Sequence, residues 1–168
     1  MTTGFSEHFG LLAAYNAWAN GRVMEACGRL SDREFQAPRQ AFFGSISGTL
    51  NHVLVGDRSW LARLRGDPPA GYALDQILYD TFTDLERARR AEDQQIAAYV
   101  GGFDETAFGS TVSYKTVKGA AFENTIQEIL THMFNHQTHH RGQIHDLLSQ
   151  TDVPPPELDL IFYLRAIV

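Results

Sequence analysis

The chain has 168 residues, 43% hydrophobic and 20% charged, which is the composition of a globular protein with enough apolar side chains for a core. Its formal net charge of -6 argues against a nucleic-acid partner, because binding nucleic acid requires a basic face. The single cysteine, Cys27, excludes an internal disulfide, and no apolar run approaches the roughly 20 residues of a membrane span, so we expect a cytoplasmic protein without a membrane partner.

The first half of the chain predicts two long helices. Apolar residues recur at helical spacing from about Phe5 to Leu30, and Ser31-Asp32 ends this segment. A second helix is predicted from about Ser45 or Ser47 to Leu64, where a Gly-Asp-Pro-Pro run stops it. The connection that follows is long, so the helices need not form a simple up-down-up-down stack.

The second half predicts two further helices with an irregular segment between them. The third helix runs from about Thr83 to Val100 and opens with a capping-box pattern. Strand-forming residues from Ser110 to Phe122 predict a small hairpin or extended crossover, with a turn at Lys118-Gly119. The fourth helix runs from about Asn124 or Thr125 to Ser149, and the apolar tail from Leu158 to Val168 is expected to pack back on the bundle as a short helix.

Together these elements predict an all-α fold. We expect a four-helix bundle with long crossovers, and a small β-hairpin between the third and fourth helices. The chain contains no internal repeat and no low-complexity segment, so residues 1–168 are expected to form a single domain.

The predicted fourth helix carries an unusual concentration of histidines. Four of the seven histidines fall between His132 and His140. On a helical wheel, His136 and His140 lie inside the apolar stripe, one turn apart. His132 and His139 lie at the edge of the stripe, and His145 points in roughly the opposite direction from His136.

Two imidazoles on a core face have four ring nitrogens to satisfy, and they cannot easily satisfy one another. A metal ion removes the difficulty, because two histidines at positions i and i+4 can bind the same ion. The alternative is a polar, water-filled interior with hydrogen-bonded histidines. A third ligand would come from another helix, where only His52 and His8 are available. We expect His8 to be exposed, whereas the helical periodicity permits His52 as a ligand without requiring it.

Rival metal chemistries lack the residues that they need. No histidine is followed by glutamate, as a zinc-protease helix requires, and no Glu-x-x-His pair of a di-iron bundle is present. One cysteine excludes a cysteine-type zinc site. A site built only from histidines remains.

The segment from His136 to Ile144, HQTHHRGQI, resembles the HxxxHRGQ signature of the DinB-like, YfiT-type superfamily of metal-dependent bacterial proteins. The resemblance covers essentially the whole chain, because three weaker segments agree in order. These are Tyr15-Asn16-x-Trp18-Ala19-Asn20, Leu50-Asn51-His52 and Asp159-Leu160-Ile161-x-Tyr163-Leu164.

This resemblance implies a four-helix bundle with unusual connectivity and a metal site of three histidines. One histidine comes from the second helix and two from the fourth, which matches His52, His136 and His140. The ion implied is divalent, and imidazole ligands suit zinc, nickel or iron. Members are often dimeric, so a homodimer is expected.

Related branches of the superfamily include mycothiol-dependent maleylpyruvate isomerase and bacillithiol S-transferase. The resemblance therefore implies a metal-dependent enzyme acting on a small-molecule substrate, as a thiol-dependent S-transferase or isomerase with a low-molecular-weight thiol. Two alternatives stay open. One is a metal-dependent hydrolase that uses the same site, and the other is a non-enzymatic stress-related or ligand-binding bundle whose metal is structural.

Four further residues are assigned provisional roles. Asn16 lies in the core stripe of the first helix, as a partner of the site or as a satisfied core amide. Trp60 is predicted to pack in the aromatic core, and the lining of a pocket is the alternative. Arg141 is expected off the core face, pairing an acid, and Gln143 is expected to support a metal ligand.

Overall fold

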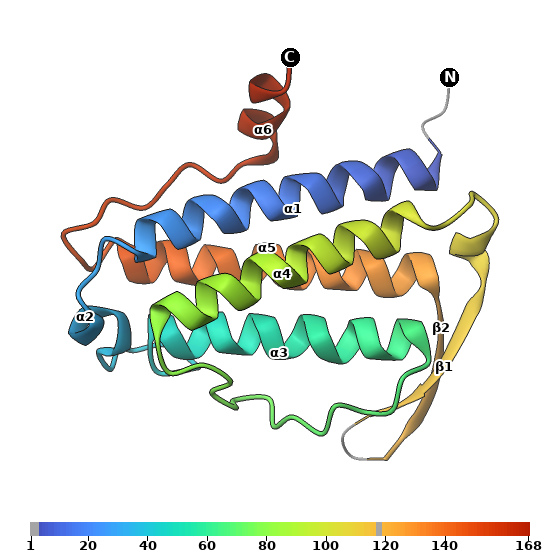
Figure 1. Ribbon diagram of the computed structural model, residues 1–168, viewed down its shortest axis with the longest axis horizontal. Coiled ribbons are helices and arrows are strands. Elements are labelled where there is room, and N and C mark those ends of the chain that lie inside the picture. The colour runs from blue at the N-terminus through green and yellow to red at the C-terminus, as the bar shows by residue number, and fades with distance from the viewer. Residues whose placement is uncertain (1–3, 117–118) are drawn as a thin grey trace.

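A computed structural model of the protein describes residues 4–116 and 119–168 (Figure 1). Four long helices form the body of the molecule, and an antiparallel hairpin lies at one end of it. The all-α bundle with a small hairpin is therefore confirmed. The elements in chain order are α1 (Phe5–Cys27), α2 (Asp32–Gln36), α3 (Ile46–Arg65), α4 (Phe82–Gly101), the 3-10 helix η1 (Ala107–Gly109), β1 (Thr111–Lys115), β2 (Ala121–Thr125), α5 (Ile126–Leu148) and α6 (Leu160–Ala166).

The long helices are not connected as a simple up-down-up-down stack. Helix α1 packs on α4 and α5, and α3 packs on the same two helices. The connection 66–81 returns along the length of α3, so α3 and α4 run in the same direction (Figure 1). Helices α1 and α5 run the opposite way. Within residues 4–116 and 119–168, no helix is both long and apolar enough to cross a membrane.

Local capping explains where several elements begin. The Thr125 hydroxyl accepts a hydrogen bond from the Glu128 amide, and this capping box, which was not predicted, starts α5 at Ile126, close to the predicted start. Helix α4 begins at Phe82, one residue earlier than predicted, because Thr81 caps it. Helix α2 was not predicted, although its capping box of Ser31 and Glu34 is visible in the sequence as Ser-x-x-Glu.

The hairpin and the tail agree with their predictions. Strands β1 and β2 pair antiparallel with Tyr114 opposite Phe122, and β2 leads directly into α5. Of the predicted turn, Lys118 lies outside the described residues, and Gly119 has a positive φ of 84°. Helix α6 packs on α1 through Tyr163, whose ring centroid lies 5.6 Å from that of Trp18.

A layer of polar side chains crosses the middle of the bundle, and each is at most 7% exposed. Arg89 on α4 lies 2.5 Å from a carboxylate oxygen of Asp57 on α3, and 2.9 Å from one of Asp93. Asn20 on α1 donates to Asp93 over 2.9 Å. We call this layer the core network; it joins all four long helices and consists of Asn16, Asn20, Asp57, Arg89, Asp93, Gln137 and Arg141.

The core network corrects the prediction for Arg141. We expected this side chain off the core face, but it is only 3% exposed. Its guanidinium donates to the side-chain oxygens of Asn16 and Asn20, and therefore reaches the acid Asp93 only through these amides. The helical wheel gave the wrong position for Arg141, because it identifies the core by apolar residues, whereas this buried face of α5 is polar. Asn16 is accordingly a satisfied core amide.

We predict that Arg89→Ala lowers the free energy of unfolding by about 3–5 kcal/mol, because it leaves Asp57 and Asp93 buried without their counter-charge. The neighbouring Arg90 is exposed and pairs with Glu86 on the surface, so Arg90→Ala should cost less than about 1 kcal/mol. Urea denaturation of the two variants measures the difference. Equal losses would contradict a central role for the core network.

Candidate metal centre

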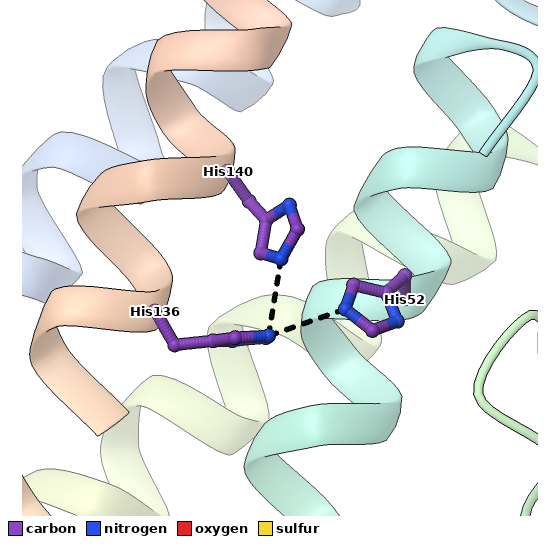
Figure 2. A group of neighbouring side chains, drawn as sticks. All are labelled: His52, His136 and His140. Carbon is purple, nitrogen blue, oxygen red and sulfur yellow. Dashed lines mark hydrogen bonds between the residues drawn. The ribbon is translucent and has the colours of Figure 1, made fainter. Parts of the chain in front are cut away.

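The three histidines singled out from the sequence lie together in the structure (Figure 2). His52 comes from α3, and His136 and His140 come from consecutive turns of α5. Nε2 of His136 lies 3.2 Å from Nε2 of His52 and 3.0 Å from Nε2 of His140. One ring nitrogen from each residue falls within 4.8 Å of the others, so the three could hold one metal ion.

The outer nitrogens of two of these rings have partners that define the proton positions. Nδ1 of His52 lies 2.7 Å from the carbonyl oxygen of Leu74, which can only accept, so Nδ1 carries the hydrogen. Nδ1 of His140 lies 2.8 Å from the amide oxygen of Gln143, whose NH₂ group lies 3.1 Å from Nε2 of His139. Both inner nitrogens, Nε2 of His52 and Nε2 of His140, therefore present lone pairs.

Hydrogen bonds alone cannot satisfy all three Nε2 atoms of the cluster. His136 can donate at most one hydrogen from Nε2, yet two lone pairs face that atom. Protonation does not resolve the conflict, because burial and the neighbouring histidines lower the pKa of His136 to about 3. Burial likewise lowers the pKa of His140 to about 4, and it lowers the pKa of His52. At neutral pH the three rings are uncharged, which is the form that binds a metal.

The spacing of the nitrogens also suits a metal ion. Zinc binds imidazole nitrogens at about 2.0–2.1 Å, and tetrahedral coordination then separates two ligand atoms by about 3.4 Å. The two Nε2–Nε2 separations in the structure, 3.0 and 3.2 Å, are close to this value. Three protein ligands leave at least one coordination position for a substrate or water. The donor set therefore fits a divalent ion with an open position.

The carbonyl of Leu74 is held in place by the residue next to His52. Asn51 is fully buried, and its side-chain oxygen accepts hydrogen bonds from the amides of Leu78 and Tyr79, over 2.8 and 3.0 Å. Its NH₂ group donates to the carbonyl of Tyr79 over 3.2 Å. Asn51 thus anchors the long connection 66–81 against α3, beside the histidine that this connection orients.

Phe43 covers one side of the cluster. Its ring stacks on that of His52 with centroids 3.8 Å apart and planes 16° apart, and it lies edge-on to His140 at 5.7 Å. An aromatic wall excludes water and strengthens electrostatic interactions at the nitrogens. Sequence reasoning missed both Phe43 and Leu74, because neither lies in a periodic segment or a motif.

A glycine allows His136 to fit between the two helices. A Cβ atom on Gly56 would lie 2.9 Å from Cε1 of His136, closer than such atoms approach one another. The absence of a side chain on α3 at this point therefore makes room for the imidazole from α5. The contact between Gly56 and His136 could not be predicted from the sequence, because it depends on how α3 and α5 pack.

The remaining histidines lie outside the cluster. His8, His139 and His145 are exposed, as expected for His8 and His145. His132 packs on Trp60 with ring centroids 4.9 Å apart, and its ring lies 5.7 Å from that of His136. Trp60 is only half-buried, so it borders the core instead of filling it.

Comparison with known proteins agrees with this architecture. The family model of the DinB family matches residues 2–167. The chain belongs to the DinB family. It is also similar to the curated Protein DinB of Bacillus subtilis (strain 168), at 26% identity over an alignment of 158 residues that covers 91% of this chain and 91% of that protein. The family resemblance inferred from the motifs is thereby confirmed.

In this DinB-family chain, the HxxxHRGQ segment combines several structural roles. His136 and His140 bring two of the three clustered nitrogens, and Gln143 orients the second ring. Arg141 turns to the other side of α5 and enters the core network. Gly142 is exposed and has open space where a Cβ atom would stand.

We predict that Gly56→Ala weakens zinc binding by about 10–100-fold, because the new methyl group displaces the ring of His136. Gly142→Ala is the matched control, since its methyl group meets nothing within 4 Å and alanine favours the helix. Competition with a chromophoric chelator measures both affinities. Unchanged affinity in Gly56→Ala would show that the position of His136 does not matter for the metal.

Proposed function

We propose that His52, His136 and His140 hold one divalent ion, zinc, nickel or iron, and that this centre carries out a thiol-dependent transfer reaction. The observation that supports the proposal most strongly is the convergence of the Nε2 lone pairs of His52 and His140 on the ring of His136. When bound, the ion supplies Lewis acidity, which lowers the pKa of a thiol that contacts it.

The character of the ligand set suits an anionic thiolate. All three ligands are neutral, so the protein adds no negative charge to the centre, and an anionic thiolate is attracted to it. In the described part of the chain, the ligand cluster contains no carboxylate. Asp57, which lies on α3 with His52, already accepts hydrogen bonds from Arg89 and Gln137. A hydrolase is the alternative use of the same centre, because an ion held by three histidines also acidifies bound water. Within the described residues, no acidic side chain joins the cluster as a general base for that reaction.

In the proposed reaction, the thiol loses its proton to solvent and its sulfur forms a bond to an electrophilic carbon. The leaving group departs with the electron pair of the broken bond. The carbonyl of Leu74 and the side chain of Gln143 hold the rings of His52 and His140 in orientation. Phe43 excludes water from one side of these rings, which preserves the reactivity of a thiolate.

A structural metal is the competing function, and one observation favours it. The three ligands come from α3 and α5, so an ion bound to them would also cross-link these helices. A non-enzymatic ligand-binding bundle would need such an ion for stability only. The two functions differ in their dependence on an added thiol.

To test the proposal, the protein is purified without a nickel column and then loaded with zinc. Its reaction of monochlorobimane with each of a panel of low-molecular-weight thiols is followed by the fluorescence of the product. We expect conjugation that falls by about a hundredfold or more in His136→Ala and His140→Ala, which also lose the metal. His145→Ala, exposed at the end of α5, should keep both metal and activity.

Two outcomes would contradict parts of the proposal. Absence of turnover with every thiol, together with a large fall in melting temperature on chelation, would establish the structural role. Full metal retention in His52→Ala would overturn the three-histidine centre.

A further inference from the structure

A large cleft lies at the hairpin end of α3, between the connection that follows this helix and the strands β1 and β2. Its volume is about 1160 Å³, enough for a small organic ligand. Aromatic side chains line it from both sides: Tyr72 from the connection, and Tyr114 and Phe122 from the hairpin. The metal centre does not use these residues.

The cleft lies on the same face of α3 as the glycine that contacts the histidine cluster. Gly56 contacts His136, and Ser59 and Arg63, one and two turns further along the same face, line the cleft. At a rise of about 1.5 Å per residue, the path from Gly56 to Arg63 is about 10 Å long. This is the distance that a ligand seated against Arg63 must span to meet the ring of His136.

Arg63 is the distinctive charged group of the cleft. It is half-buried, with its guanidinium carbon 4.4 Å from the ring centroid of Trp60 and 5.3 Å from that of Tyr114. Among residues 4–116 and 119–168 it has no hydrogen-bond or ion-pair partner, whereas the nearby Arg65 donates to Gln95 over 3.1 Å. Burial lowers the pKa of Arg63, a sign that its charge is incompletely solvated.

The other charged groups of the cleft lie at its rim. Asp67, Lys115 and Glu123 are all exposed, and Glu123 accepts a hydrogen bond from the hydroxyl of Ser113 over 2.8 Å. Water therefore screens these groups more than it screens Arg63. The charge that a ligand meets inside the cleft is that of the guanidinium.

We propose that this cleft binds an organic acid with an aromatic body, and that Arg63 is the residue that binds its carboxylate. The Arg63 guanidinium lies close to the rings of Trp60 and Tyr114, and a guanidinium can donate two parallel N–H groups to a carboxylate. The aromatic body packs on Tyr72, Tyr114 and Phe122. The inference rests on the proposed function in one respect: it identifies this acid as the electrophilic substrate, whose reactive end points toward the histidines.

The test compares hydrocinnamate with its uncharged amide by titration calorimetry on the full-length, zinc-loaded protein. We expect the acid to bind at least about tenfold more tightly than the amide. Arg63→Gln should remove this preference, and Arg65→Gln, the same change two residues along α3, should keep it. The comparison of acid and amide on the unmodified protein requires no variant to fold.

His136→Ala separates this inference from the proposed function. We expect the metal-free variant to retain the preference for the acid, because the cleft is built from α3, the connection and the hairpin. Loss of the preference in His136→Ala with retention in Arg63→Gln would place the carboxylate on the metal and overturn the assignment. Equal affinity for acid and amide in the unmodified protein, or no binding of either, would also overturn it.

Discussion

The Nδ1–H groups of His52 and His140 each donate to an oxygen outside the cluster, and this commitment leaves their inner nitrogens as acceptors. Three neutral imidazoles with converging lone pairs form an unfavourable arrangement unless a cation lies among them. This unfavourable arrangement occurs at one point of the bundle, where the neighbouring groups hold the histidine rings in specific orientations. That is the pattern expected of a functional site.

The long connection between α3 and α4 follows from the same requirement. A short loop would reverse the chain and leave His52 without an acceptor for Nδ1–H. The observed connection runs back along α3, where Asn51 anchors it and the carbonyl of Leu74 meets His52. The parallel arrangement of α3 and α4 is therefore linked to the orientation of a histidine (Figure 1).

The core network and the histidine cluster divide the circumference of α5 between them. Gln137 and Arg141 each follow a clustered histidine in sequence, and point to the polar side chains of the other helices. Because neighbouring residues on a helix are about 100° apart, fixing Gln137 and Arg141 also fixes the rotation of α5. The direction in which His136 and His140 face is set in this way.

Most of the fold could be predicted from the sequence, because apolar spacing defined the long helices and strand formers marked the hairpin. The buried position of Arg141 could not, since periodicity of apolar residues does not recognise a polar interior. Spacing in the apolar stripe indicated His136 and His140, whereas His52 needed the family resemblance. Phe43 and the carbonyl of Leu74 come from irregular segments, whose positions depend on tertiary contacts alone. The expected homodimer remains a prediction.

The most direct measurement of the central claim is X-ray absorption spectroscopy at the zinc edge of the loaded protein. Our account predicts three imidazole nitrogens at about 2.0–2.1 Å with one or more further light-atom ligands. A spectrum with a sulfur ligand from Cys27, or with fewer than three imidazoles in the unmodified protein, would contradict the three-histidine centre.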